Sequence, residues 1–294
     1  MSSSGPRDGD PLAPYRGRLL GLAYRMLGSR SDAEDVVQDA YLRFAGAQDV
    51  RNTEAFLVTI VTRLCLDRLK SAKVQREVYV GPWLPEPVFD ADGLSADTAT
   101  ELADDLSFAL LLALDRLSPL ERAAFLLHEV FDRPFSEVAE MLDRSEAACR
   151  QLAARARRGV RDERPAPQAP PEKHARLLSA FGDAVISGDI SRLASLLRED
   201  AIAITDGGGR KPAALNPIIG PEKIARLFIS LAAKNAGRDL RLVPSVINGS
   251  IGALLYLDGE IDHTLSMAID GDRIAAIYLV RNPDKLRHVV VARQ

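Results

Sequence analysis

The stretch Phe135–Val160, FSEVAEMLDRSEAACRQLAARARRGV, shows two helical patterns separated by a break. Its first half repeats apolar residues at helical spacing and ends at Asp143-Arg144. Ser145 then offers a helix N-cap, and the second half carries a narrow stripe of small apolar residues. Between positions 144 and 161 there are six arginines and one carboxylate, Glu146. The pattern predicts two helices joined by a tight turn, the second with a basic outer face.

Such a pair of helices is typical of a helix-turn-helix whose second helix enters the DNA major groove. Arginine suits this role because its planar fork contacts guanine or phosphate through two hydrogen bonds. The alternative is a solvated basic face neutralised by nearby Asp and Glu, and composition alone leaves it open. The whole chain has 38 basic and 41 acidic residues, a formal net charge of −3. The positive charge is therefore local.

The composition also bounds the class of protein. A chain of 294 residues, 47% hydrophobic and 5% aromatic, fits two or three helix-rich soluble domains. Its longest apolar run, 108–114, is too short to span a bilayer, and the N-terminus has no signal-peptide pattern. We therefore expect a cytoplasmic protein without membrane attachment. Cys65 and Cys149 form no disulfide or metal pattern, so we expect no metal and no cofactor.

Two segments divide the chain, one rich in proline, glycine and acid at 78–97 and one proline spacer at 164–171. We expect a helical domain at 11–78, a linker at 79–103, a second helical domain at 104–163 and an α+β domain at 172–290. In the last domain two early helices precede strand-like segments separated by Asp-Gly turns. These segments are 201–205, 245–249, 251–257, 263–269 and 273–280.

The segment 15–44, YRGRLLGLAYRMLGSRSDAEDVVQDAYLRF, resembles the core-binding helices of bacterial extracytoplasmic-function (ECF) sigma factors. At its centre, Asp35, Gln38 and Asp39 stand at i, i+3 and i+4 on one face of a helix. In the family the corresponding helix docks on a coiled coil of the β′ subunit of RNA polymerase. The resemblance therefore implies core RNA polymerase as a partner, bound through these three side chains.

The segment 49–77, DVRNTEAFLVTIVTRLCLDRLKSAKVQRE, is similar to the loop and helix with which these factors open the downstream −10 box of the promoter. The resemblance implies a flipped base held by the loop 49–52, with Asn52 among its polar groups. Many members have tryptophan early in the helix, where this chain has Val58-Thr59. Phosphates of the opened single strand would be contacted by Arg63, Arg68, Lys70 and Lys73.

The segment 115–158 resembles the family's domain for the upstream −35 box, which is read as double-stranded promoter DNA. In this alignment Ser145 begins the recognition helix. Base edges are then within reach of Glu146, Arg150 and Gln151. Phosphate contacts are expected from Arg144, Arg155, Arg157 and Arg158.

The α+β domain resembles the SnoaL-like cone that a subgroup of ECF sigma factors carries at the C-terminus. The resemblance rests on three phrases: Trp83-Leu84-Pro85-Glu86-Pro87, Asp206-Gly207-Gly208-Gly209 and Asn282-Pro283-Asp284-Lys285-Leu286. The subgroup usually follows its glycines with lysine, whereas this chain has Arg210-Lys211. Glycine permits close approach, and the sole tryptophan needs burial. We therefore predict that the linker docks on the other two phrases and that the cone regulates in cis.

Two other classes of function stay open. One is a SnoaL-like isomerase or cyclase fused to a DNA-binding module; the other is a polymerase-independent helix-turn-helix regulator whose cone senses a small molecule. Candidate general bases are Asp206, Asp258, Asp262 and His263. Asp258-Gly259 fits a hairpin turn and a lone histidine is usually structural, so we expect no catalytic activity. Any small-molecule ligand of the cone is unknown.

Overall fold

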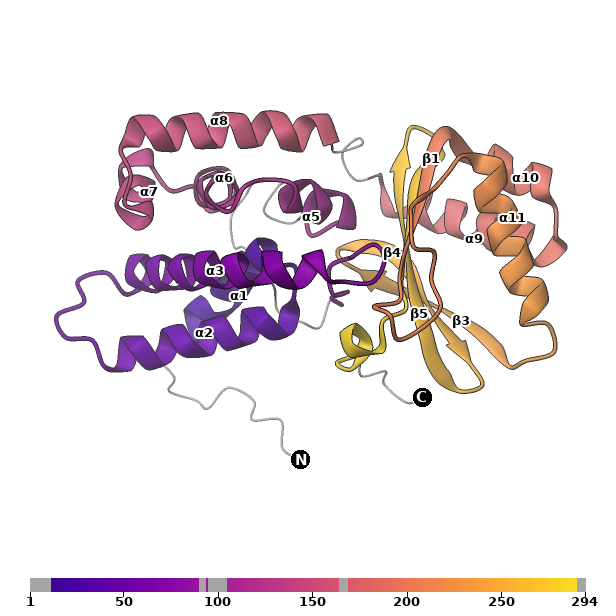
Figure 1. Ribbon diagram of the computed structural model, residues 1–294, viewed down its shortest axis with the longest axis horizontal. Coiled ribbons are helices and arrows are strands. Elements are labelled where there is room, and N and C mark those ends of the chain that lie inside the picture. The colour runs from indigo at the N-terminus through magenta and orange to yellow at the C-terminus, as the bar shows by residue number, and fades with distance from the viewer. Residues whose placement is uncertain (1–11, 90–93, 95–104, 164–168, 290–294) are drawn as a thin grey trace. The chain divides into compact units, whose positions relative to one another are not determined.

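The computed structural model describes residues 12–89, 94, 105–163 and 169–289, without the side chains of 71–77 (Figure 1). The chain forms two compact units. The first contains Met1–Val74, Asp92–Asp104 and Leu114–Gly159; the second contains Gln75–Ala91, Asp105–Ala113 and Val160–Gln294. Linker residues 79–89 thus belong with the C-terminal domain, as do residues 105–107 before the second helical domain.

The first unit begins with three helices, α1 (Ala13–Leu27), α2 (Arg30–Ala45) and α3 (Thr53–Glu77). Gly28 ends α1 in the left-handed conformation, and the Ser29 hydroxyl caps α2 by accepting from the Asp32 N–H at 3.1 Å. In the core of these helices, Tyr24, Val37 and Val61 are fully buried. The helical domain predicted at 11–78 is thus present.

The second helical part contains α5 (Phe108–Asp115), α6 (Pro119–Phe125), a π-helical turn η2 (Leu126–Val130), α7 (Phe135–Leu142) and α8 (Glu146–Glu163). Asp143, at φ 52°, ends α7, and the Ser145 hydroxyl accepts from the Ala148 N–H at 3.3 Å. Cys149, Ala153 and Ala156 form the buried stripe of α8. The predicted helix-turn-helix is confirmed.

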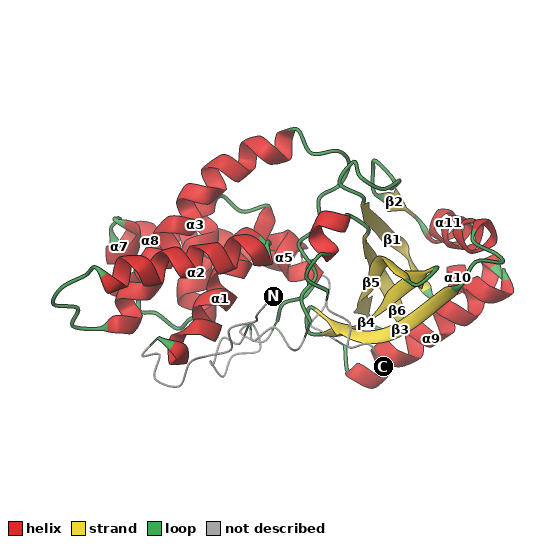
Figure 2. Ribbon diagram, turned by 90° about the horizontal axis from the view of Figure 1, so that it is seen from below, coloured by secondary structure: helices red, strands yellow, loops and turns green. Residues whose placement is uncertain are grey.

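The second unit is an α+β domain. Its helices are α9 (Pro171–Ser187), α10 (Ile190–Ser195) and α11 (Pro221–Lys234). Its strands are β1 (Leu197–Asp206), β2 (Ile218–Ile219), β3 (Leu240–Ile247), β4 (Ser250–Leu257), β5 (Glu260–Asp270) and β6 (Arg273–Val280). The sheet order is β2-β1-β6-β5-β4-β3, with β1 and β6 parallel and the other neighbours antiparallel. Figure 2 shows α9–α11 together on one side of this curved sheet.

The predicted α+β fold is confirmed, with two elements missed. The sequence predicted only two helices in this domain, so α11 and β2 were not expected. The helix had a signal in Pro221 at its start and in the spacing of Ile224 and Phe228, which are buried. Strand β2 has two residues, too few to show alternation. The predicted turn at Asp258-Gly259 is present, with both residues at positive φ.

The two faces of the sheet carry separate cores. The face toward α9–α11 packs Phe181 and Phe228 edge to face, with ring centroids 4.9 Å apart. The opposite face is covered by the linker, the start of α5 and a 3₁₀ turn η3 (Pro283–Leu286). Its core contains Leu84, Phe108, Ile247, Ala276, Tyr278, Val280 and Leu286. The linker therefore forms an integral layer of the C-terminal unit.

Candidate functional site

A buried carboxylate at the end of β1 holds the linker. The Asp206 side chain has no exposed surface and accepts hydrogen bonds from the Tyr79 hydroxyl at 2.6 Å and the Leu84 N–H at 2.9 Å. Lys285 Nζ lies 2.7 Å from the same carboxylate and also donates to the Leu84 carbonyl oxygen at 2.5 Å. One ion pair thus connects the sheet, the linker and η3. We call Tyr79, Leu84, Asp206 and Lys285 the linker dock.

Aromatic rings and apolar side chains complete the linker dock. Lys285 Nζ lies 4.5 Å from the ring centroid of Trp83 and 5.0 Å from that of Tyr79, both within cation–π range. Trp83 is only partly buried, whereas Leu84 is fully buried and Pro85 is buried. The expectation that Trp83 is the buried anchor is therefore wrong in one respect. Leu84 fills the core, and Trp83 packs over the cation.

Glycines let the β1–β2 loop approach the linker closely. Gly208 has φ 58°, and a Cβ built there would lie 3.0 Å from the Tyr79 hydroxyl and nearer still to the Asn282 amide. Asn282 itself donates to the Tyr79 hydroxyl at 2.9 Å. A Cβ at Gly209 would lie 3.3 Å from Val80 of the linker. Gly207 instead tightens its own loop against the Lys211 carbonyl.

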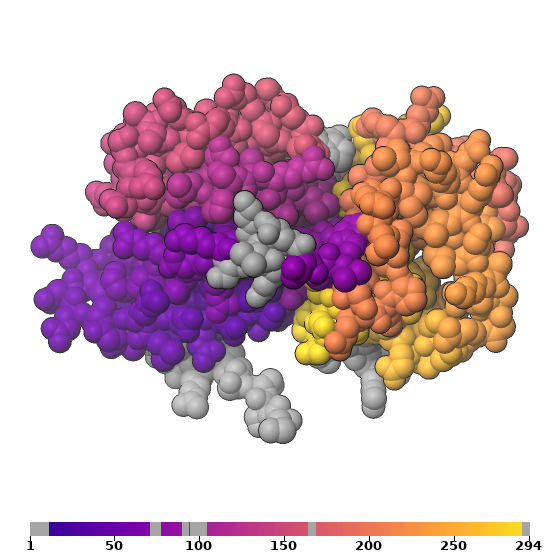
Figure 3. Space-filling model, in the orientation of Figure 1, coloured from indigo at the N-terminus to yellow at the C-terminus, as the bar shows by residue number. Residues whose placement is uncertain are grey.

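The 3₁₀ turn η3 presents the remaining residues of the third phrase. The Asn282 side chain caps this turn by accepting from the Asp284 N–H at 3.0 Å, with Pro283 in the first turn. Asp284 pairs with Arg287 on the surface, while Leu286 joins the core with Leu84. In Figure 3 purple residues of the linker region lie directly against the orange surface of the C-terminal domain. The structure brings the three quoted phrases together.

A second attachment of the linker was missed by sequence reasoning. Asn248 is buried at φ 53°; its side-chain oxygen accepts from the Val88 N–H at 3.2 Å and its amide donates to the Leu106 carbonyl at 2.9 Å. Its N–H donates to the Val88 carbonyl at 2.8 Å. The sequence analysis had placed Asn248 and Gly249 in the strand-like segment 245–249, whereas β3 ends at Ile247. Nothing in the sequence marked Tyr79 either.

The predicted polymerase-binding residues are exposed on α2. Asp35, Gln38 and Asp39 share one side of that helix. Arg68 of α3, predicted to contact DNA, lies against this acidic side with Nη1 2.9 Å from Asp32 Oδ1. It also lies 3.6 Å from Asp35 and 3.9 Å from Asp39.

Two of the residues predicted to bind the −10 strand, Asn52 and Arg63, line a cavity. Asn52 caps α3 by accepting from the Ala55 N–H at 3.0 Å. The loop 48–52, α3 and α7 line a cavity of about 480 Å³. On its α7 side, Arg63 donates to the Met141 carbonyl at 3.3 Å. Lys70 is exposed and pairs with Asp67 at 2.8 Å, and the Lys73 side chain lies outside the described residues.

The residues predicted to bind the −35 box differ in their pairing. Gln151 and Arg158 of α8 are exposed, as is Arg144, which precedes α8 and donates to the Asp143 carbonyl oxygen at 2.7 Å. The other predicted DNA contacts pair within the helical unit: Arg150 with Glu146 at 2.5 Å, Arg155 with Glu121 at 2.7 Å, and Arg157 with Glu129. The alternative of a neutralised basic face therefore describes part of this surface. Each exposed pair is worth at most about 1 kcal/mol, which a phosphate can replace.

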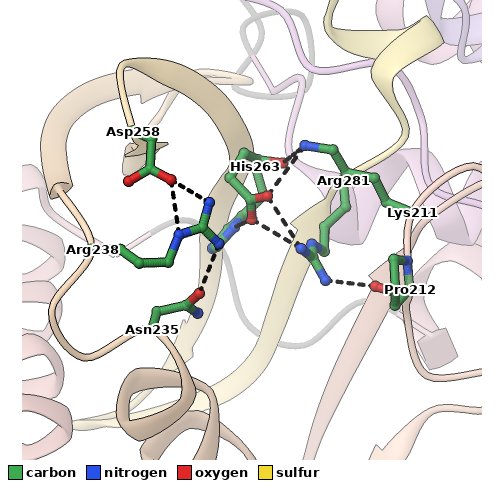
Figure 4. Close-up of polar contacts among 8 residues, drawn as sticks. Lys211, Pro212, Asn235, Arg238, Asp258, His263 and Arg281 are labelled. Carbon is green, nitrogen blue, oxygen red and sulfur yellow. Dashed lines mark hydrogen bonds and ion pairs between the residues drawn. The ribbon is translucent and has the colours of Figure 1, made fainter.

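The carboxylates considered as general bases are all engaged, and Figure 4 shows the surroundings of Asp258 and His263. Asp262 lies 2.8 Å from His263 Nδ1, 3.1 Å from Arg281 and 3.2 Å from Lys211. The hydrogen bond from His263 and the charge of Arg281 hold the pKa of Asp262 well below its usual range, while burial lowers the pKa of His263. Asp258 pairs with Arg238, and Asp206 belongs to the linker dock.

The helical domains are similar to known sigma-factor domains. Residues 12–74 match the family Sigma-70 region 2, and residues 107–158 match Sigma-70, region 4. These matches define the class of protein as a sigma factor. Among the described helices, none has the length and hydropathy that a bilayer span requires.

The relatives narrow that class. The chain is 36% identical over 281 residues to the ECF RNA polymerase sigma factor SigJ of Mycobacterium tuberculosis, covering 92% of this chain and 90% of SigJ. It is 31% identical over 278 residues to the probable ECF sigma factor SigI of that species, covering 92% of each. The crystal structure of SigJ matches with a TM-score of 0.75 and 33% identity over 93% of this chain and 96% of that one. The chain belongs to the ECF RNA polymerase sigma factors and directs transcription initiation.

Proposed function

We propose that the C-terminal domain regulates this sigma factor in cis by controlling the linker between its two DNA-binding domains. The observation that carries the proposal is the linker dock, where a fully buried carboxylate fixes Tyr79 and Leu84. Asn248 fixes the linker again at Val88 and Leu106. Docking therefore sets the path of the chain between the domains that bind the −10 and −35 boxes.

The length of the docked segment makes this control substantial. An extended chain covers up to about 3.3–3.6 Å per residue, so the eleven residues 79–89, once released, can span any distance up to about 36–40 Å. A change of that size in the reach between two domains alters their effective concentration at paired DNA boxes. Undocking is thus expected to change transcription from promoters with a fixed spacing.

A variant of Asn248 tests this proposal. Asn248→Gly keeps the positive φ but removes both side-chain hydrogen bonds to the linker. We expect promoter-dependent transcription to change while core polymerase affinity stays constant. The control is Gly182→Ala, on α9, where an added Cβ meets nothing within 4 Å. Equal transcription by both variants and the wild type would argue against control through the linker.

We also propose that Asp35, Gln38 and Asp39 bind the β′ coiled coil of core polymerase. The support is their shared exposure on α2 and their negative charge, which steers a basic partner. Asp35→Lys combined with Asp39→Lys should abolish binding to core polymerase with an unchanged circular dichroism spectrum. The control is Glu199→Lys, an exposed residue of β1. Unchanged core affinity in the double variant would refute this assignment.

For promoter DNA, the proposal assigns two surfaces. Asn52, Arg63, Lys70 and Lys73 serve the opened −10 strand, and Arg63 reaches it only after leaving the Met141 carbonyl. The −35 box is bound by the recognition helix. Its residues are Arg144, Ser145, Glu146, Arg150, Gln151, Arg155, Arg157 and Arg158.

The proposed activity is non-catalytic and cytoplasmic. Of the four candidate bases, the three carboxylates are held by cations or by the linker, and His263 is bonded to Asp262 through Nδ1. Asp262→Asn should therefore leave promoter-dependent transcription unchanged provided the fold is intact. A loss of transcription with a native melting curve would favour the enzyme alternative.

A further inference from the structure

Arg68 crosses from α3 to an acidic stripe on α2. Nη1 donates to Asp32 Oδ1 at 2.9 Å and to the Asp32 carbonyl oxygen at 3.3 Å. The guanidinium also lies 3.6 Å from Asp35 and 3.9 Å from Asp39. The Arg68 side chain is 31% exposed, whereas those of the three acids are 53%, 66% and 51% exposed. A partly buried cation thus lies among three more exposed carboxylates.

This position is unsuited to a phosphate. A phosphate oxygen in contact with the guanidinium would lie close to three carboxylates, and like charges at such distances repel. By contrast, Arg63 and Lys70 on the same helix are exposed outside this stripe. The family resemblance assigned Arg68 to DNA, but its surroundings fit the polymerase-binding side of the domain.

We propose that Arg68 is an internal counter-cation of the polymerase-binding face. In the free protein it occupies the acidic stripe where a basic side chain of the partner would bind, and it thereby slows association with core polymerase. The inference rests on the proposed role of Asp35 and Asp39. Its benefit to the fold is that it offsets the repulsion among acids at positions 32, 35 and 39, which share one helix face.

Arg68 has two opposing effects on association with core polymerase, and their relative sizes decide whether it speeds or slows association. As an anchor it would orient the acids and favour binding; as a charge it cancels part of the field that attracts a basic partner. Only Asp32 is held at hydrogen-bond distance. The contacts to Asp35 and Asp39 are long, and both acids are more than half exposed, so their orientation is weakly fixed. The charge effect therefore dominates.

The test measures association of the full-length protein with core polymerase. Arg68→Gln removes the charge and keeps most of the stem, Arg68→Lys keeps the charge, and Lys70→Gln removes a charge paired with Asp67 instead. We expect Arg68→Gln to associate about two- to fourfold faster than the wild type at about 0.05 M salt, with the difference lost near 0.5 M. Arg68→Lys should match the wild type, and Lys70→Gln should show a smaller increase.

Three results would overturn the inference. Slower association of Arg68→Gln would show an anchoring role, and unchanged association would show no role in the face. A defect only in −10 strand binding by the assembled holoenzyme would restore the DNA assignment. If Arg68→Gln does not fold, Asp32→Asn takes its place in the test. This variant frees Arg68 from Asp32, so Arg68 covers Asp35 and Asp39 more fully and association should be slower than in the wild type. Faster association would contradict the inference. The double variant Asp35→Lys with Asp39→Lys tests the polymerase-binding face separately. If this variant binds core polymerase normally, the proposed face is refuted together with the role of Arg68.

Discussion

Replacing Asp206 by asparagine should release the linker. The substitution keeps the shape of the side chain and removes its charge. The new amide oxygen, in the place of Oδ2, can still accept from the Leu84 N–H and from Lys285, but the amide nitrogen then stands in the place of Oδ1 and cannot accept the hydrogen bond that the Tyr79 hydroxyl donates. Lys285, whose side chain is nearly buried, then loses the negative charge of Asp206 as its ion-pair partner.

The expected loss follows from that geometry. Removing one partner of a buried ion pair costs about 3–5 kcal/mol. Lys285 keeps the Leu84 carbonyl and two aromatic rings, so we take the lower end, about 3 kcal/mol. That corresponds to about a 100-fold shift of the docking equilibrium. With a urea m-value of about 2 kcal/mol/M, the unfolding midpoint of the C-terminal unit should fall by about 1.5 M.

Trp83 reports the outcome because it is the only tryptophan and it packs on Lys285. In Asp206→Asn its emission should move to the red, and promoter-dependent transcription should change. The control is Asp284→Asn, the same chemical change in η3 at a side chain that is 42% exposed and pairs with Arg287. The reasoning is refuted if the Asp206 and Asp284 variants share one emission maximum and one urea midpoint.

Three further outcomes are expected. Gly208→Val should also undock the linker, because its Cβ overlaps the Asn282 amide, and a wild-type Trp83 emission would contradict this. Burial and the hydrogen bond to Asp206 hold the pKa of Tyr79 well above its ordinary value of 10, so docking should be constant below pH 10 and weaken as the pH rises above it. Tyr79→Phe should remove that dependence in Trp83 fluorescence, and an identical pH profile in the variant would refute the role of this phenol. In binding titrations, Arg150→Ala should relax the base preference at one position of the −35 box. Arg157→Ala should weaken binding to all −35 sequences alike and reduce the slope of log affinity against log salt concentration by about 1. Equal losses from both variants would refute the division between base and phosphate contacts.

The helical domains were predictable from local pattern. The domain at 11–78 was predicted to be helical, and the apolar spacing of 135–160 with the Ser145 cap identified the helix-turn-helix. These features depend on residues close in sequence, where helix periodicity and capping chemistry act. The three glycine-, tryptophan- and proline-containing phrases also led to the linker dock.

The unpredicted features depend on packing between distant segments. Tyr79 and Asn248 are ordinary residues whose partners lie more than 100 positions away. Leu84 rather than Trp83 fills the core because of the register of the linker on the sheet. Arg68 faces the acids of α2 because of how α2 and α3 pack, which charge patterning along one helix does not reveal.

Transcription with purified core polymerase tests the central claim most directly. Pooled promoter fragments would be transcribed by core polymerase alone, with the wild type, and with the Asp206→Asn and Asp284→Asn variants. The account predicts specific start sites only when the sigma factor is present, with a changed yield for Asp206→Asn and a wild-type yield for Asp284→Asn. Specific transcripts with equal yields from all three proteins would contradict regulation through the linker dock.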